Sequence, residues 1–398
     1  MALDVYITGM GIVSGIGIGV DQTLVSLREQ KSGIQPLKHL QTIHDLPCAE
    51  VDLSEDQMRE LLNISADEVV TRTALMAMLA TREALQQARL TMDGTYRVAF
   101  IHGTTVGGME KSEVYYFDFL QNDLHNEFIE AHDCGACTEK IADYFGGFSF
   151  VSTPSTACSS AANACILGAN LLEAGIVDIA VVGGSECITK FHLNGFKSLM
   201  ILDSQPCRPF DETRAGLNLG EGAAFIVMES KAHAAKRGVA PLCRLSGYGN
   251  ACDAYHQTAS SPEGQGAFLA MNAALEMSNL QPADVSYINA HGTGTPNNDE
   301  SEGQAIVRVF GNNPPHVSST KSLTGHTTSA AGGVEAVISI LALQHKFVPA
   351  NCNFTTQMQS LPFTPVINVL HDIPVQHVLS NSFGFGGNNT SLIFSNVQ

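Results

Sequence analysis

The chain has 398 residues, of which 44% are hydrophobic and 15% are charged, and its formal net charge is -18. This length and hydrophobic content support a sizeable core in one large body or two domains. The acidic balance argues against nucleic acid or an anionic membrane surface as a partner, because both are negatively charged.

Targeting signals and metal ligands are sparse. No run of eighteen or more apolar residues occurs, so we expect no membrane-spanning helix. Residues 1–11 predict a first strand and not a signal peptide, because no basic region precedes their apolar run. We therefore expect a cytoplasmic protein with ten free thiols.

His132, Cys134 and Cys137 are spaced like half a zinc site, but no second ligand pair follows, and we expect no metal.

Strands and helices are predicted to alternate through the first half of the chain. Residues 5–12 predict a strand, and 21–28 predict a helix with Asp21 as its N-cap. The apolar spacing is helical at two further segments, 54–62 and 67–89. A buried strand is predicted at 97–101, and further strands are predicted at 148–153, 178–184 and 222–228.

The second half repeats this pattern. A predicted strand runs into His291-Gly-Thr-Gly-Thr, just as an earlier one runs into His102-Gly-Thr-Thr. Segments that begin Ser-Thr at Ser155 and Ser319 each precede a helix of small residues.

Two similar halves follow from this repeat. The first half is the longer one, and the aromatic and acidic segment 110–138 is the expected insertion. We predict an α/β fold with halves at 1–240 and 241–398, packed into one body with a pocket at the seam.

Cys158 is the candidate nucleophile. It stands between a predicted strand and a predicted helix, and a position near a helix N-terminus favours a thiolate. A small core cysteine is the alternative interpretation. His291 and His326 occupy comparable places in the second half, where open α/β folds assemble their sites at strand ends. Each histidine alone would be a loop or capping residue; together with Cys158 they form a candidate site.

Four motifs in this order resemble the elongating β-ketoacyl-ACP synthases of the thiolase superfamily. They are Thr156-Ala-Cys158-Ser-Ser, His291-Gly-Thr-Gly-Thr, Lys321-Ser-Leu-Thr-Gly-His326 and Asn381-Ser-Phe-Gly-Phe-Gly-Gly. Arg208-Pro-Phe-Asp211 and Gly220-Glu-Gly-Ala also match, so the likeness spans essentially the whole chain. It implies a thiolase-like five-layer αβαβα architecture built from two duplicated halves.

The resemblance also implies a decarboxylative Claisen condensation that gives 3-oxoacyl-ACP. Cys158 would hold the acyl chain as a thioester. His291 and His326 would donate hydrogen bonds to the malonyl-ACP carbonyl, and the backbone N–H groups of Cys158 and Phe385 would form the oxyanion hole. Acyl carrier protein (ACP) is the implied partner. No cofactor is implied, because the phosphopantetheine arm of ACP carries the substrates.

Further residues take supporting roles through the same matches. Lys321 would be a buried catalytic cation paired with Glu335, and a surface lysine is the alternative. Thr293 and Thr295 would bind the phosphopantetheine arm; turn-forming hydroxyls are the alternative.

The remaining matches concern the loop and the acyl pocket. Asp299 and Glu302 would order the loop that follows His291. Phe385, between two glycines, would gate the acyl pocket that Val106 and Phe196 line. Plain core packing is the alternative for Val106 and Phe196.

Several alternatives stay open or lose support at this stage. The stretch Ala215-Gly-Leu and the insertion resemble ketosynthases of aryl polyene and polyketide clusters, so fatty-acid elongation is one of two candidate pathways. A homodimer is implied and a heterodimer is possible. A non-catalytic chain-length partner would lack Cys158, a thiolase would carry a second cysteine in the last glycine-rich strand, and initiating ketosynthases have asparagine where His326 stands.

Overall fold

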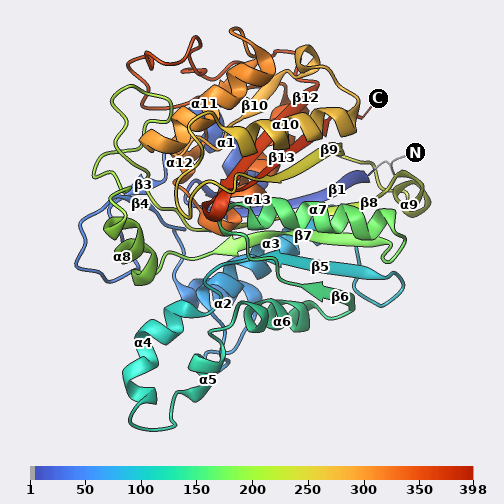
Figure 1. Cartoon of the computed structure of the whole chain (residues 1–398). Helices are drawn as coiled ribbons and strands as arrows, with labels where there is room; N and C mark the ends of the chain where they lie inside the picture. The colour runs from blue at the N-terminus through green and yellow to red at the C-terminus, as the bar shows by residue number, and fades with distance from the viewer. Residues whose placement is uncertain (1–4, 398) are drawn as a thin grey trace.

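Ten strands pair edge to edge across the molecule in the computed structural model, which describes residues 5–397 (Figure 1). In the N-terminal part they are β1 (Val5–Ser14), β5 (Val98–Gly103), β6 (Phe148–Ser152), β7 (Ile179–Glu186) and β8 (Gly222–Ser230). In the C-terminal part they are β9 (Cys243–Cys252), β10 (Tyr287–Asn289), β11 (His316–Ser318), β12 (His377–Gly384) and β13 (Asn388–Ser395). Their order is β11-β10-β12-β13-β9-β1-β8-β7-β5-β6.

The two parts have the same topology. β5 pairs in parallel with β6 and β7, whereas β7–β8 and β8–β1 are antiparallel. Correspondingly, β10 pairs in parallel with β11 and β12, whereas β12–β13 and β13–β9 are antiparallel. The half-sheets join where β1 pairs with β9. The predicted α/β fold of duplicated halves is confirmed.

Helices separate and cover the half-sheets. α7 (Ser160–Glu173) packs on β5 and β7, and α13 (Ala331–His345) packs on both β8 and β12, so these helices lie between the halves. α3 (Arg72–Gln87) covers the outer face of the N-terminal half, and α10 (Gln265–Ser278) covers that of the C-terminal half (Figure 1). Every residue of α13 from Ala331 to Leu343 is buried, as expected for a helix enclosed on all sides. The result is the five-layer αβαβα arrangement.

The segment predicted as an insertion, 110–138, lies at one end of the molecule. It forms α4 (Met109–Phe119), α5 (Asn126–Glu130) and the start of α6 (Cys134–Phe145). α4 and α5 extend away from the body in Figure 1, and α4 buries none of its residues. In the C-terminal half the equivalent connection, from β10 to β11, carries α11 (Pro296–Phe310).

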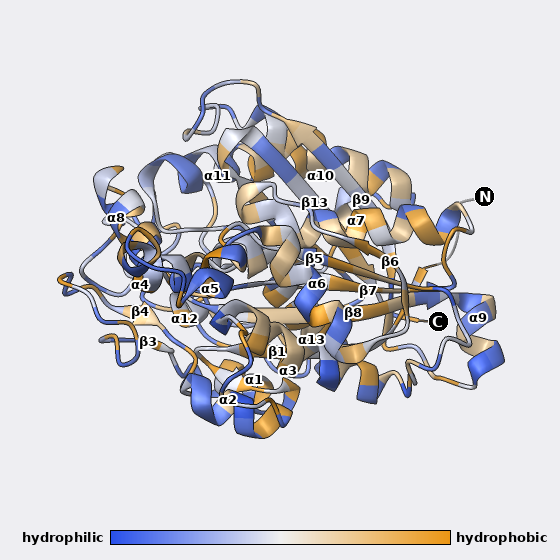
Figure 2. Cartoon of the chain, turned by 90° about the horizontal axis from the view of Figure 1, so that it is seen from below, coloured by the Kyte–Doolittle hydropathy of each residue, from blue (hydrophilic) through white to orange (hydrophobic). Residues whose placement is uncertain are grey.

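The other helices are short. They are α1 (Val20–Glu29), α2 (Glu55–Leu62), α8 (Lys190–Ser198), α9 (Lys231–Arg237) and α12 (Lys321–Thr324), and α12 is fully buried. The short strands pair as β2 (Gly17–Ile18) with β1 and β3 (Ile34–Gln35) with β4 (Cys48–Ala49). In Figure 2 hydrophobic colour runs along the inner strands β7 and β8, whereas α9 is largely hydrophilic.

Two helix starts differ from the prediction. α1 begins at Val20 with Gly19 as its N-cap, so Asp21 lies in the first turn. The helix predicted from residue 67 begins at Arg72, because the Thr71 side chain accepts the Ala74 N–H and caps it there.

Thiols and membrane segments were further sequence expectations. All ten cysteines lie within the described residues and carry free thiols, as predicted. From residue 5 to residue 397, none of the helices combines the length and the apolar character that crossing a bilayer requires.

Candidate active site

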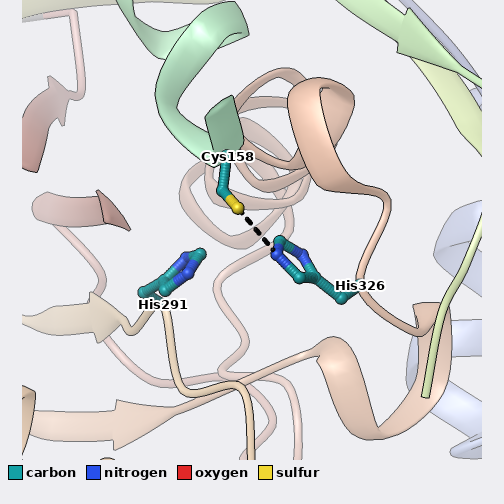
Figure 3. A group of neighbouring side chains, drawn as sticks. All are labelled: Cys158, His291 and His326. Carbon is teal, nitrogen blue, oxygen red and sulfur yellow. Dashed lines mark hydrogen bonds between the residues drawn. The ribbon is translucent and has the colours of Figure 1, made fainter. Parts of the chain in front are cut away.

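Cys158 lies at the N-terminal end of α7. It belongs to the 3-10 turn η1 (Ala157–Ser159), and its side chain is buried. Ala157 takes a left-handed conformation, with φ of 51°, which turns the chain sharply before the helix. From this turn the thiol points toward the side chains of His291 and His326 (Figure 3).

The structure brings His291 and His326 to this thiol. His291 follows β10, and His326 follows α12. The Nε2 atom of His326 lies 3.1 Å from the Cys158 sulfur, and the two imidazole centroids are 5.3 Å apart at 84°. The sulfur and one nitrogen of each ring all lie within 4.8 Å of one another (Figure 3).

Lys321 fixes the orientation of His291. Its ammonium donates to the His291 carbonyl oxygen at 2.6 Å and lies 3.3 Å from Nδ1 of the same residue. An ammonium can only donate, so Nδ1 accepts and the ring hydrogen sits on Nε2, which faces the cavity. Lys321 is 1% exposed and forms an ion pair with Glu335, so it is not a surface lysine.

Burial decides the charge state of the two histidines. It lowers the pKa of His291 and His326 well below the usual value, and the neighbouring Lys321 ammonium lowers both further. Both imidazoles are therefore neutral near pH 7 and act as neutral hydrogen-bond donors or proton acceptors.

The thiol itself differs from the sequence expectation. Burial raises the pKa of Cys158 to about 11, although Lys321 and a hydrogen bond from the Phe385 backbone lower it. The expectation that this position favours a thiolate is therefore wrong for the free protein, because desolvation outweighs the stabilising N–H groups.

Two buried carboxylates order the loop after β10. Glu302 accepts hydrogen bonds from the backbone N–H groups of His291 (2.8 Å) and Gly292 (2.7 Å). Asp299 accepts from the N–H groups of Phe210 (2.8 Å) and Gly294 (3.2 Å). These are the supporting positions that the sequence suggested. Burial raises the pKa of Glu302 to about 7.

A cavity of about 280 Å³ opens onto the three groups. Thr293 and Thr295 line it with their hydroxyl oxygens 2.9 Å apart. Phe196 and Phe385 line it too, and their rings stack with centroids 5.9 Å apart. The cavity thus offers polar contacts beside the loop that follows β10 and an aromatic wall beside the thiol.

Val106 lies apart from this cavity. It is buried in the core of the N-terminal half, and its backbone N–H donates to Glu186 at 3.0 Å. Its predicted place in the acyl pocket stays a prediction.

Other lining residues gave no sequence signal. The exposed Met200 and its neighbours Ile201 and Leu217 form an apolar rim, and Ser260 and Asn297 add polar groups. Except for Asn297, which lies in the first turn of α11, they come from irregular loops, where no periodicity marks a residue as inward facing.

The cysteine and histidines are also the one grouping with metal-ligand spacing among residues 5–397, whereas His132, Cys134 and Cys137 form no such group. The Lys321 ammonium beside His291 would repel a cation placed there. The donor set suits a polarised carbonyl better than a metal ion.

Models of the two β-ketoacyl synthase domains match this chain, the N-terminal domain at residues 2–234 and the C-terminal domain at 242–355. The chain belongs to the β-ketoacyl synthase family. The resemblance seen in the sequence motifs is thereby confirmed, and the chain is an acyltransferase of the 3-oxoacyl-ACP synthase type.

Full-length relatives agree with this assignment. The chain is 32% identical to 3-oxoacyl-[acyl-carrier-protein] synthase 2 of Staphylococcus aureus (strain N315), over 99% of this chain and 98% of the relative. Among solved structures it resembles the ishigamide ketosynthase/chain length factor, with a TM-score of 0.93 and 30% identity over 100% of both chains. It also resembles the ketosynthase ApeO in complex with its chain length factor ApeC from Xenorhabdus doucetiae, with a TM-score of 0.86, 31% identity and coverage of 99% and 98%.

Proposed function

We propose that this β-ketoacyl synthase joins an acyl group held on Cys158 to malonyl-ACP, giving 3-oxoacyl-ACP, CO2 and free ACP. The observation that carries the proposal is the convergence of Cys158, His291 and His326 within 4.8 Å at one cavity. Residues 1–240 supply the nucleophile and 241–398 supply both histidines, so the seam between the halves is the reaction site.

The first half-reaction is acyl transfer. The Cys158 sulfur attacks the thioester carbon of acyl-ACP, and the bond from that carbon to the ACP sulfur breaks. His326 Nε2, 3.1 Å away, takes the thiol proton and returns it to the departing ACP sulfur. A neutral imidazole can do this, whereas an imidazolium could not.

The second half-reaction forms the carbon–carbon bond. The malonyl carboxylate leaves as CO2, and the electron pair of the broken bond forms an enolate. The enolate oxygen accepts a hydrogen bond from His291 Nε2–H and a second one from His326, once the ring hydrogen of His326 has moved from Nδ1 to Nε2. The enolate carbon attacks the Cys158 thioester, and the backbone N–H groups of Cys158 and Phe385 hold the tetrahedral oxyanion. The thiolate then leaves and takes up a proton, as the thiol pKa of about 11 favours.

The other lining residues fit the two substrates in this proposal. Thr293 and Thr295 bind the phosphopantetheine arm at the cavity wall, and Phe385 with Phe196 separates the thiol from the entrance. ACP is the partner, because both substrates reach the thiol as its thioesters, and the cytoplasmic location expected from the sequence stays part of the proposal.

We propose a homodimer, with a heterodimer as the alternative. α4 and the residues after it leave apolar side chains exposed, among them Phe117 at 71% and Leu124 at 81%. β6 is an edge strand of the described sheet and carries the exposed Val151. Exposed apolar side chains and an unpaired strand edge each favour a subunit contact.

Fatty-acid elongation is the proposed pathway, and a polyketide or aryl polyene pathway is the alternative. The staphylococcal synthase supports the first and the two solved ketosynthases support the second, at nearly equal identity. A non-catalytic chain-length role is disfavoured, because Cys158 and both histidines are retained. Intact-mass profiling of the enzyme with a panel of saturated and unsaturated acyl-ACPs would separate the pathways.

The reaction is tested with purified protein, acyl-ACP and malonyl-ACP. We expect a Cys158-linked acyl intermediate and 3-oxoacyl-ACP by intact mass, and we expect Cys158→Ala to abolish both. Cys165→Ala is the matched control, because Cys165 is a buried thiol of α7, the helix that follows Cys158, and does not line the cavity. Retained turnover by Cys158→Ala would remove Cys158 from the mechanism.

A further inference from the structure

The two N–H groups assigned to the oxyanion hole come from separate turns. Cys158 lies in η1, and Phe385 lies in the turn η4 (Phe385–Gly387) between β12 and β13. Gly386 and Gly387 have φ of 81° and 78°, so this second turn is left-handed where only glycine fits easily. Cys158 and Phe385 lie outside the backbone hydrogen-bond pairs of the sheet. The relative position of the two turns therefore depends on other contacts between them.

The side chain of Asn388 connects the two turns. The Ser159 hydroxyl hydrogen is shared between the Thr156 carbonyl oxygen (2.7 Å) and Asn388 Oδ1 (2.8 Å). Ser159 directly follows the nucleophile and is fully buried, and Asn388 directly follows η4. One amide oxygen therefore links the cysteine turn to the turn of Phe385.

Two further asparagines fix the direction of the Asn388 amide. Asn163 Nδ2 donates to Asn388 Oδ1 at 2.8 Å, and Asn250 Nδ2 donates at 2.9 Å. Asn163 Nδ2 also donates to the Thr156 hydroxyl at 2.8 Å, and its Oδ1 accepts from Asn250 at 2.9 Å. With three donors around it, the oxygen of Asn388 must be the atom that faces the cysteine turn.

Backbone packing leaves little play at this junction. A Cβ atom on Gly384 would lie 2.8 Å from the Thr156 carbonyl oxygen and 3.2 Å from the Cys158 nitrogen. The two turns thus touch through their main chains. Because the main chains of the two turns are in contact, a hydrogen bond across the junction limits how far the two N–H groups can move apart.

We propose that Asn388 and Ser159 are positioning residues that set the spacing of the two oxyanion N–H groups, with Asn163 and Asn250 orienting Asn388. The inference rests on the proposed function, because it assumes an acyl group on Cys158. These residues contact neither the thiol nor the substrate cavity, so they act through the turns alone.

The test measures the carbonyl of the acyl-enzyme. Wild type and variants are acylated on Cys158 by acyl-ACP labelled with ¹³C at the thioester carbonyl, and the stretching frequency is read by difference infrared spectroscopy. We expect Asn388→Ala to shift the band to higher frequency and to lower kcat by ~10-fold with KM for malonyl-ACP unchanged, less than the ~100-fold loss when an oxyanion donor is removed outright. Ser159→Ala should give the same shift.

Two variants control for a general loss of packing. Asn388→Asp keeps an acceptor oxygen for all three donors and should retain the wild-type band. Tyr248→Phe removes another hydrogen bond between β9 and α7, from Tyr248 to Asn170 Oδ1 at 2.7 Å, about two turns further along α7, and should leave band and kcat unchanged.

The outcomes separate this inference from the proposed function. If the acylated Asn388→Ala variant keeps the wild-type carbonyl stretching frequency, the positioning role is overturned and the proposed function stands. Ser159→Ala takes its place in this test if Asn388→Ala does not fold. A wild-type enzyme that takes no acyl group on Cys158 overturns the proposed function and the positioning role with it.

Discussion

The Nε2 atom of His326 lies 3.1 Å from the sulfur of Cys158, although 168 residues separate the two in the chain. Backbone hydrogen bonds on both sides of the histidine hold it there. Its N–H donates to the Asn218 carbonyl at 2.8 Å, and its carbonyl accepts from the Gly220 N–H at 3.0 Å. A Cβ at position 220 would lie 2.3 Å from the Thr324 carbonyl oxygen, so only glycine lets the two segments approach this closely. The motif Gly220-Glu-Gly of the N-terminal half therefore helps to position His326 of the C-terminal half.

His291→Ala should separate the two half-reactions. His326 contacts the thiol, whereas His291 reaches only the cavity in which malonyl-ACP would bind. We expect acylation of Cys158 to continue and the release of CO2 from malonyl-ACP to fall by ~100-fold, the typical loss for one oxyanion donor. Intact mass follows the first step and labelled CO2 follows the second. Equal losses in both steps would contradict the division of labour.

Lys321→Met should make Cys158 less reactive. The Lys321 ammonium lowers the pKa of the buried thiol, so its removal raises that pKa further and reduces the thiolate fraction. We expect slower alkylation of Cys158 by iodoacetamide at pH 8, measured by peptide mass. The double variant Lys321→Met/Glu335→Gln serves as the control, because it removes the carboxylate that the single change leaves buried without its partner. Faster alkylation in the single variant would refute the electrostatic role.

The duplicated topology could be predicted from the sequence because the same order of strands and motifs occurs in both halves. The similar motifs at His102 and His291 lie at the ends of two equivalent strands, β5 and β10. Each of these strands pairs in parallel with two neighbours, β6 and β7 in the first half and β11 and β12 in the second. Two helix starts were predicted wrongly, because the N-cap positions of Gly19 and Thr71 depend on local dihedral angles that composition does not reveal.

Parts of the site lay outside what spacing can predict. The charge state of Cys158 depends on the balance between burial and its neighbours, and burial is a tertiary property. The link between Ser159 and Asn388 joins residues 229 positions apart through one amide oxygen, and no periodic pattern marks such a contact. The motifs therefore indicated which groups react, while only the fold shows how their turns are held together.

The reactivity of Cys158 should depend steeply on pH. With a thiol pKa of about 11, the thiolate is a small fraction at neutral pH. Between pH 7 and pH 9 we expect the alkylation rate in the absence of ACP to rise by ~10-fold per pH unit, since only the thiolate reacts. Cys252, an exposed thiol in the same molecule, gives an internal reference in each digest. A rate that levels off below pH 8 would show that the turn stabilises the thiolate more than burial opposes it.

His102→Gln should change how stability depends on pH. His102 is fully buried between the Thr138 hydroxyl at 2.9 Å and the Ser185 hydroxyl at 2.7 Å, and burial lowers its pKa to about 3. The unfolded chain binds a proton at this residue below about pH 6.5, whereas the folded protein does not until about pH 3. As the pH falls from about 6.5 to about 3, the folded wild-type protein therefore loses stability relative to its unfolded chain because of His102. The His102→Gln variant does not, because glutamine takes up no proton.

At pH 7.5 we expect His102→Gln to be less stable than wild type by about 1–2 kcal/mol, because a buried hydrogen-bonded ring is replaced. Between pH 7.5 and pH 5.5 the difference should shrink by about 1.4 kcal/mol, because the unfolded chain takes up a proton at His102 over about one pH unit of this range and the folded protein does not. Urea unfolding at the two pH values measures both quantities, and the same substitution at the exposed His39 is the matched control. A difference that stays constant from pH 7.5 to pH 5.5 would mean that folded His102 takes up its proton in the same range as the unfolded chain, which its two hydroxyl partners and its burial argue against.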